Sequence, residues 1–172
     1  MSNNLERLLA ILKVQADVID KANESCQFRY KSVQRLILET GNPFFKKLEP
    51  SPFRGKPKQC FQNCFEALLR HSGFIYCEGY TIDDKLPIPI LHAWLVNDAF
   101  EVVDPTWNDK DSTGLTYFGV ALNDEFVIDS SIRTKHYGIL ESDYLSNYQL
   151  LREGFPKGAL HSKFHLDLCD SN

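Results

Sequence analysis

The apolar positions in the first forty residues follow the period of an α-helix. Between 4 and 22 they recur at spacings of three and four residues, which predicts a helix with one buried face. A second helical pattern covers 30–39 and ends at Gly41 and Pro43, residue types that commonly terminate helices. The proline-rich segment 41–58 that follows is predicted to be a loop without regular structure.

The next helical pattern begins at a cysteine. Apolar residues from Phe61 to Leu69 fall on one face of a helix that starts at Cys60 and ends before Gly73. At about 100° per residue, Cys64 lies inside this apolar face, whereas Cys60 lies at its edge and at the first helical position. We therefore expect Cys64 in the core and Cys60 beside a cleft.

The middle of the chain alternates in the period of β-strands, and a helical pattern returns near its end. The alternation predicts a strand with Tyr76, Glu78 and Tyr80 on one face, and further strands downstream. The pattern therefore predicts an α+β fold, a single domain over 1–172 with its core at about 58–128. The predicted strands are 74–82, 90–96, 100–104, 115–120 and 125–128, and the late helix is 143–151.

Two of these strands form a predicted hairpin that carries a histidine and an aspartate. If Val96 and Phe100 close a three-residue turn, His92 lies directly opposite Asp104. Opposed Cβ atoms are about 4.5–5.5 Å apart, so the carboxylate can accept an imidazole N–H. A slip of one residue would send the two side chains to opposite faces. A His–Asp bond of this kind either supports catalysis or merely braces the hairpin.

Composition and charge narrow the class of protein. With 43% hydrophobic and 24% charged residues, the chain is typical of a soluble globular domain. A net charge of −4 gives no basic surface for nucleic acid or anionic lipid, and no apolar run is long enough to cross a membrane. The first residues read as an amphipathic helix rather than a secretory signal. The five cysteines are irregularly spaced, which indicates reduced thiols in a cytoplasmic protein.

A zinc site is the main alternative use of the cysteines. Cys60, Cys64, His71 and Cys77 are separated by gaps of three, six and five residues, whereas zinc sites usually have a tight two-residue cysteine spacing. The helical pattern also assigns Cys64 to the core. We therefore expect no metal ligands and no cofactor.

The order of Cys60, His92 and Asp104 along the chain matches a known chemistry. A thiol, an imidazole and a carboxylate are what acyl transfer by a cysteine nucleophile requires. The first turn of a helix suits such a cysteine, because unpaired N–H groups and the helix dipole favour a thiolate there. These three residues are the predicted catalytic triad.

Short motifs around the same residues carry a resemblance to a known superfamily. The segments 59–61 (QCF), 92–94 (HAW) and 104–106 (DPT) resemble the core motifs of transglutaminase-like, papain-like cysteine enzymes, and 76–80 and 117–120 resemble segments of small bacterial and phage members. The resemblance implies a cysteine-bearing helix packed on an antiparallel sheet, with the histidine and aspartate on adjacent strands. It covers about 58–120, so the N-terminal helices at 4–40 are additions to that core.

The resemblance implies an enzyme that acts on an amide or peptide carbonyl of a protein or peptide substrate. The acyl group would pass from the thioester to water, as in a cysteine peptidase, amidase or deamidase, or to an amine, as in a transglutaminase. The same triad serves both acceptors, so the sequence leaves the choice open. A catalytically inactive binding module with the same fold is the alternative.

The second oxyanion donor does not follow the patterns of the superfamily. Arg54 stands where papain-like enzymes have a glutamine six residues before the cysteine. We expect the backbone N–H of Cys60 to serve as one donor, with the side chain of Gln59 or Asn63 as the second. Glu78, on one strand face with two tyrosines, is expected either to line the cleft or to pair with a lysine.

Overall fold

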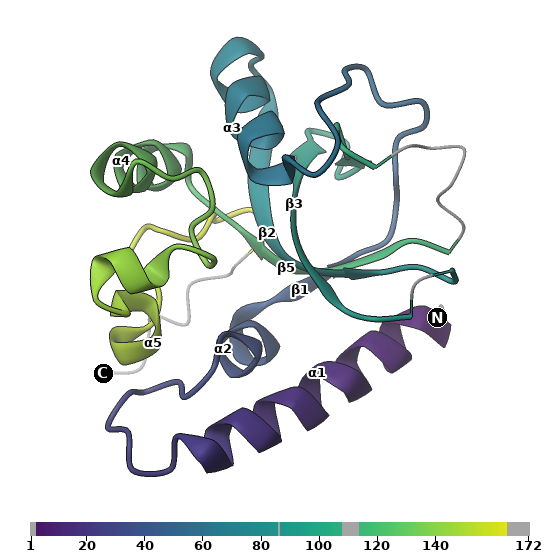
Figure 1. Cartoon of the computed structure of the whole chain (residues 1–172). Coiled ribbons are helices and arrows are strands. Elements are labelled where there is room, and N and C mark those ends of the chain that lie inside the picture. The colour runs from purple at the N-terminus through teal and green to yellow at the C-terminus, as the bar shows by residue number, and fades with distance from the viewer. Residues whose placement is uncertain (1–2, 86, 108–113, 165–172) are drawn as a thin grey trace.

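A five-stranded antiparallel sheet forms the centre of the protein (Figure 1). The computed structural model describes residues 3–85, 87–107 and 114–164. The strands lie in the order β1-β5-β2-β3-β4, so β2 is the central strand, its hairpin partner β3 lies beside it, and β1 and β4 form the edges. Their bounds are Asn42–Phe44 (β1), Phe74–Ile82 (β2), Ile90–Asn97 (β3), Val102–Val103 (β4) and Thr116–Ala121 (β5).

The helices pack against one face of this sheet. In Figure 1, α1 runs along the bottom of the view with α2 beside it, α3 stands near β2 and β3, and α4 and α5 lie together at the left. The helix α3 makes its main contacts with β3 and β2. The bounds are Asn3–Ala22 (α1), Val33–Thr40 (α2), Cys60–Arg70 (α3), Asp124–Thr134 (α4), Gln149–Glu153 (α5) and the 3₁₀ helix Asp143–Ser146 (η1).

Buried apolar side chains, a capping hydrogen bond and ion pairs hold the two N-terminal helices together. Leu8 and Leu12 of α1 are fully buried, as the spacing predicts. The side chain of Ser32 caps α2 by accepting the N–H of Arg35, and its own hydroxyl donates to Asp20. Arg35 pairs with Asp20 at 2.7 Å and also reaches Asp17 at 2.6 Å. The pair of helices therefore packs as one unit against the sheet.

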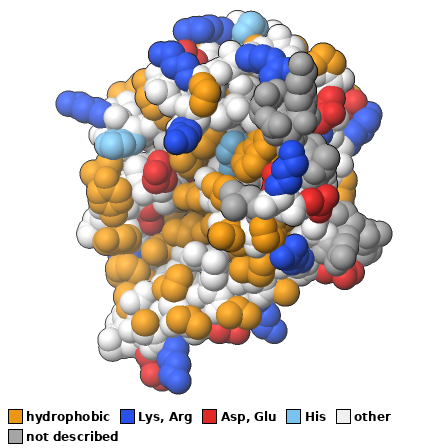
Figure 2. Space-filling view, turned by 45° about the vertical axis from the view of Figure 1, so that its right-hand side comes forward, with side chains coloured by type: hydrophobic (Ala, Val, Ile, Leu, Met, Phe, Trp, Pro, Cys, Tyr) orange, Lys and Arg blue, Asp and Glu red, His pale blue; other side chains and the backbone are white. Residues whose placement is uncertain are grey.

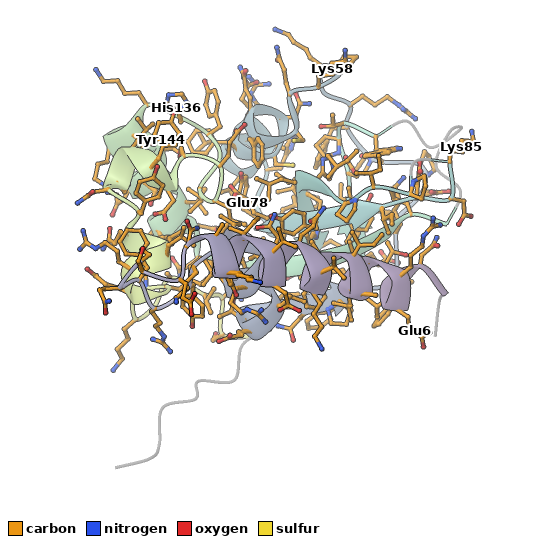
Figure 3. All side chains as sticks on the ribbon, turned by 60° about the horizontal axis from the view of Figure 1, so that its bottom comes forward. Glu6, Lys58, Glu78, Lys85, His136 and Tyr144 are labelled. Atoms are coloured by element: carbon orange, nitrogen blue, oxygen red, sulfur yellow. The ribbon has the colours of Figure 1, made fainter. Side chains whose placement is uncertain are left out.

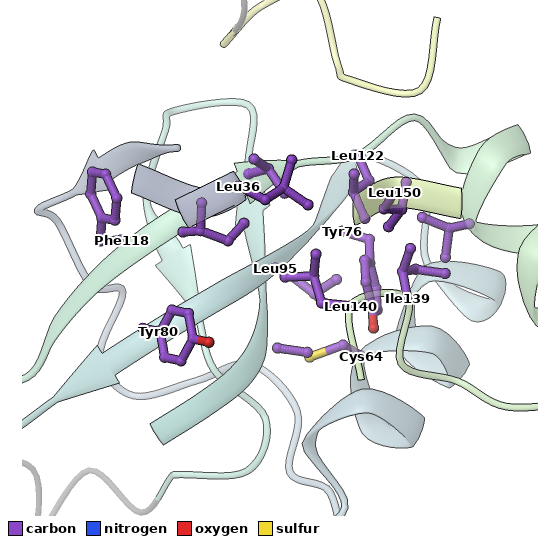
Figure 4. Packing of buried hydrophobic residues seen from close by; sticks show 14 of the residues in the cluster. Leu36, Cys64, Tyr76, Tyr80, Leu95, Phe118, Leu122, Ile139, Leu140 and Leu150 are labelled. Atoms are coloured by element: carbon purple, nitrogen blue, oxygen red, sulfur yellow. The ribbon is translucent and has the colours of Figure 1, made fainter. Parts of the chain in front are cut away.

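Each face of the sheet buries a separate hydrophobic cluster. The larger cluster joins the helices to one face and contains Cys64, Tyr76 and Leu95. Figure 4 shows Cys64 and Tyr76 near the Ile139–Leu140 segment in this cluster. The opposite face buries a smaller cluster around Trp94 and Cys77. The side-chain alternation along β2 and β3 thus decides which residues meet the helices.

Most of the predicted elements are confirmed. The structure is α+β with an antiparallel sheet and two N-terminal helices. The helix at Cys60 begins where the sequence predicts, and β2 spans 74–82 as predicted. Cys64 is buried in the core, also as predicted.

Three predicted elements are wrong. The loop at 41–58 contains β1, which pairs with β5 despite Pro43. The predicted strand at 125–128 is part of α4, because Asn123 caps a helix there by accepting the N–H of Glu125. The predicted helix at 143–151 is divided into η1 and α5, because Asn147 and Tyr148 adopt left-handed backbone angles (φ 54° and 56°).

The register of the β3–β4 hairpin differs from the prediction by two residues. Val96 lies opposite Val102 rather than Phe100, because the turn includes Phe100 in a left-handed conformation. A shift of two leaves every side chain on its predicted face. His92 and Asp104 are therefore diagonal neighbours instead of directly opposed residues.

The surface is mixed in chemical character. On the face seen in Figure 2, hydrophobic side chains gather across the middle, with lysine and arginine side chains above and to the side. Within the described part of the chain, none of the helices has the length and apolarity that a membrane crossing requires.

Candidate active site

A cleft opens where the edge of β3 is left uncovered. The strand β4 ends at Val103, so the first half of β3 has no β4 partner. Ile90, Leu91 and His92 all line the cleft, which has a volume of about 570 Å³. Consecutive strand residues point to opposite faces, so three in a row can line one cleft only at an open edge. The sheet edge thus brings His92 within reach of α3.

Cys60 reaches this edge from the first position of α3. The residue is half-buried and lines the cleft together with Phe61. The side chain of Gln59 makes no capping hydrogen bond, so the first-turn N–H groups have no side-chain cap from that residue. His92 lines the same cleft, and the interaction with Cys60 is one cause of the raised pKa of His92. The helix terminus, thiol and imidazole therefore meet at one point.

His92 and Asp104 form a buried hydrogen bond, as predicted. His92 Nε2 and Asp104 Oδ2 are 2.8 Å apart, and the side chains are 4% and 0% exposed. Because an ionised carboxylate only accepts hydrogen bonds, Nε2 carries the proton and donates. Nδ1 is then the ring nitrogen left for Cys60. A diagonal pair is within reach of an imidazole, which explains why the bond survives the two-residue shift in register.

The local sequence D-P-T-W holds the aspartate in place. Asp104 Oδ1 accepts the backbone N–H groups of Thr106 (2.9 Å) and Trp107 (3.0 Å), an Asx turn that ends β4. The hydroxyl of Tyr117 donates to Oδ2 at 2.9 Å. Both oxygens of the Asp104 carboxylate therefore have hydrogen-bond partners in addition to His92.

The buried side chains of His92 and Asp104 carry opposite charges. Burial disfavours the charged imidazole, but the charge of Asp104 and the hydrogen bonds with Asp104 and Cys60 raise the pKa of His92 to about 9. Burial also works against the Asp104 carboxylate, yet the charge and hydrogen bond of His92 and the two backbone N–H groups lower its pKa to about 2. At neutral pH the pair is an imidazolium beside a carboxylate.

Aromatic rings surround the imidazole. Trp107 meets His92 edge-on, with ring centroids 5.6 Å apart, and Trp94 stacks at 6.5 Å. The Tyr117 ring lies 6.3 Å away. The rings keep water from the His92–Asp104 bond, while Trp107 also forms part of the cleft wall.

Asn63 is not an oxyanion donor, contrary to one of the two expectations. Its amide nitrogen donates to Lys56 O and to Thr106 Oγ1, both at 2.8 Å, and its oxygen accepts Lys56 N at 3.0 Å. Both amide hydrogens are thus in use. Gly55 packs so tightly on this side chain that an added Cβ would lie 2.1 Å from Asn63 Cγ. Asn63 therefore clamps α3 to the loop before it and to the segment after Asp104.

The structure places Gln59 and Glu78 away from the main cleft. Gln59 is exposed and lines a smaller neighbouring hollow. Glu78 is completely buried on the helix side of the sheet, where it accepts Ile139 N (2.6 Å), Leu140 N (2.8 Å) and the Tyr76 hydroxyl (2.7 Å) (Figure 3). It neither lines the cleft nor pairs with a lysine, so both expectations for Glu78 are wrong.

The alternative zinc ligands do not converge. Cys64 and Cys77 lie in the clusters on opposite faces of the sheet. His71 stacks on Phe53, with ring centroids 5.0 Å apart. Among the described residues no group of three or more histidine, cysteine or acidic side chains has a metal-binding arrangement.

Sequence reasoning missed three residues of the site. Tyr117 lies on β5, and its contact with Asp104 requires the order of the strands, which no local pattern contains. Trp107 could have been found, since it follows the D-P-T segment directly. Glu141 lines the cleft from the segment between α4 and η1, for which the sequence pattern predicted no element.

The comparisons with known proteins return nothing. No family model matches the chain, and neither a curated protein nor a solved structure is significantly similar to it.

Proposed function

We propose that the protein is a thiol-dependent acyl-transfer enzyme that acts on an amide or peptide carbonyl. The observation that carries the proposal is the meeting of Cys60, at an uncapped helix N-terminus, with a buried His92–Asp104 pair inside an open cleft. A hairpin brace would need neither the thiol nor the cleft. The arrangement also supports a transglutaminase-like, papain-like core as the finer description of the fold.

In the first step, Cys60 Sγ attacks the substrate carbonyl. His92 already holds the thiol proton at Nδ1, as the imidazolium partner of the attacking sulfur, because Nε2 is held by Asp104. The raised pKa of His92 keeps this proton on the imidazole at neutral pH until the leaving group needs it. Asp104 fixes the tautomer and balances the imidazolium charge, as carboxylates do in catalytic triads.

In the second step, the tetrahedral intermediate collapses to a thioester. The imidazolium gives its proton to the leaving nitrogen, and an amine departs. Water or a second amine then attacks the thioester, with His92 as the base, and the thiol is regenerated. The first-turn N–H groups of α3 are the oxyanion donors in this proposal, because they lie at the positive end of the helix beside the nucleophile.

Covalent trapping tests the proposal. We expect p-nitrophenyl acetate to acetylate Cys60, with a burst of nitrophenolate and a 42 Da adduct that mass spectrometry maps to the peptide containing this residue. Adding an amine would show whether the acyl group passes to nitrogen or to water. Cys60→Ala should abolish the adduct.

Cys64→Ala is the matched control, because the two cysteines lie one helical turn apart and only Cys60 lines the cleft. It should keep the adduct and lower stability by about 1–2 kcal/mol. An adduct that persists in Cys60→Ala and disappears in Cys64→Ala would show that Cys64, and not Cys60, is the nucleophile. A chain that forms no adduct at any cysteine would be a binding module.

A further inference from the structure

A second hollow adjoins the cleft at Phe61. This side hollow, of about 170 Å³, is lined by Gln59, Gln62, Tyr137 and neighbouring residues, whereas the main cleft is lined mostly by apolar side chains. Phe61 and Glu141 border both. The two hollows therefore adjoin at Phe61, the residue that follows Cys60, so a substrate held at Cys60 lies next to the side hollow.

Glu141 brings a carboxylate to this junction. An added Cβ on Gly138 would lie 3.1 Å from Glu141 Oε2 and 3.2 Å from Phe61 Cδ1, so the carboxylate and the ring flank the same glycine. Among the described residues, Glu141 has no cationic side chain in ion-pair contact. His136, one of those described residues, borders the side hollow but forms no ion pair with Glu141.

A buried anchor fixes the loop that presents Glu141. Glu78 accepts the N–H groups of Ile139 and Leu140, two and one residues before Glu141, and Ser142 donates to Gly138 O. The charge of Glu141 also disfavours ionisation of Glu78, so the fold keeps two acids near each other. The anchored loop therefore holds Glu141 at the border of the two hollows.

We infer that the side hollow is a subsite for a cationic group of the substrate, a primary ammonium or a guanidinium, with Glu141 as its counter-ion. The inference rests on the proposed function, because the hollow matters only if Cys60 reacts. Phe61 and Tyr137 offer aromatic surface to the cation. Gln62 donates to Glu66, which leaves its carbonyl oxygen as an acceptor for an ammonium hydrogen.

Lys58 provides an internal comparison. It lines the main cleft but not the side hollow, whereas Glu141 borders both, so only the side hollow has the carboxylate without the lysine. A substrate with a positive group on the Glu141 side and a neutral or acidic group on the Lys58 side fits this polarity. The cation belongs either to a basic residue next to the reacting amide or to an amine that accepts the acyl group.

Charged thiol reagents test the inference without requiring turnover. Trimethylammonioethyl and sulfonatoethyl methanethiosulfonate each form a mixed disulfide with a thiol and release methanesulfinate. We expect Cys60 to react faster with the cationic reagent. Glu141→Gln should lower the cation-to-anion rate ratio by roughly fivefold, as loss of one nearby charge predicts. Glu141→Lys should lower it further, and Lys58→Gln should raise it.

Glu24→Gln is the control for net charge, because this exposed residue follows α1. It should leave the ratio unchanged. A ratio that is equal in wild type and Glu141→Gln would overturn the inference while leaving Cys60 as the nucleophile. A Cys60 that reacts no faster than Cys26 with any reagent would instead overturn the proposed function.

Substrate panels then separate the two sources of the cation. Peptide amides with lysine, glutamine or glutamate beside the reacting amide test the first source by kcat/KM. Alkyl diamines against neutral amino alcohols, offered as acceptors for the acetyl group, test the second. A lysine or diamine preference that Glu141→Gln removes supports the inference. The absence of any charge preference in both panels contradicts it.

Discussion

Two buried carboxylates on opposite faces of the sheet have nearly the same partners. Asp104 accepts two backbone N–H groups and the hydroxyl of Tyr117, and Glu78 accepts two backbone N–H groups and the hydroxyl of Tyr76. The difference is His92, which only Asp104 contacts. The pKa of Asp104 is lowered to about 2, whereas burial raises that of Glu78 to about 7.

The comparison shows that hydrogen bonds alone do not keep the pKa of a buried carboxylate low. Three donors do not offset the burial of Glu78, while an adjacent imidazolium does so for Asp104. The arrangement at Glu78 fixes a loop, and in the proposed function the arrangement at Asp104 orients a catalytic base. Under that proposal, similar local chemistry serves structure on one face of the sheet and catalysis on the other.

The largest expected effect comes from neutralising the two acids in turn. Asp104→Asn should reduce turnover by roughly 10³–10⁴-fold, because the imidazole loses its orientation and its counter-charge. Glu78→Gln should reduce it by less than about tenfold, since this side chain only holds the loop at 139–140. Steady-state kinetics of the two folded variants would measure both losses. Equal losses would remove the distinction between the two carboxylates.

The pH dependence of stability should differ in sign. The folded pKa of Glu78 exceeds its ordinary 4.5, so its contribution is fully present below pH 4.5 and is lost as the pH rises through 7, by about 3 kcal/mol. The folded pKa of Asp104 lies below 3.8, so its contribution of about 2 kcal/mol is present above pH 4 and is lost as the pH falls through 2.

Urea unfolding at a series of pH values would separate these contributions. Glu78→Gln should flatten the decline between pH 4.5 and 6.5, a range below the ordinary pKa of histidine. Asp104→Asn should flatten the acid limb instead. If Glu78→Gln left the slope between pH 4.5 and 6.5 unchanged, the raised pKa of Glu78 would be wrong.

The Asn63 clamp should have a smaller effect that is specific to catalysis. Asn63→Ala removes the bonds to Lys56 and Thr106, which should lower kcat by about 10–100-fold through misplacement of the triad and lower stability by about 1–3 kcal/mol. Asn23→Ala removes one similar amide bond, to Lys31 O, far along the chain from the cleft. It should leave kcat unchanged. Parallel losses of kcat in both variants would mean that Asn63 has no special role.

The two tyrosine hydroxyls should give the smallest effects. Tyr117→Phe and Tyr76→Phe each remove a donor to one carboxylate and should cost about 1 kcal/mol of stability. Tyr117→Phe should also raise the pKa of Asp104 and slow turnover a few-fold, whereas Tyr76→Phe should raise the pKa of Glu78 and leave turnover unchanged. NMR titration and kinetics would detect a reversal of this pattern.

Local patterns predicted the parts of the fold that depend on local physics. The helix at Cys60 and the strand at 74–82 follow from apolar spacing alone, and the His92–Asp104 bond follows from alternation along two strands. The bond survived a wrong turn because a two-residue shift preserves faces. The prediction depended on which side of the strand a residue occupies, and much less on exact opposition.

Long-range features could not be predicted in this way. The burial of Glu78 depends on a loop sixty residues away in sequence, which supplies the N–H groups of Ile139 and Leu140. The helix α4 was mistaken for a strand, because four residues of Glu125–Ile128 are too short for their period to distinguish the two. The clamp by Asn63 depends on the path of the proline-rich loop, for which propensities give no tertiary contacts.

The alkylation rate of Cys60 tests the central claim most directly. Iodoacetamide at pH 6, with each cysteine followed by peptide mass mapping, measures whether the thiol is activated by its neighbours. We predict that Cys60 is labelled first, ahead of the half-buried Cys26 and the buried Cys64, and that His92→Ala slows Cys60 alone by at least about tenfold. Labelling of Cys60 and Cys26 at equal rates, or an unchanged rate in His92→Ala, would contradict the triad.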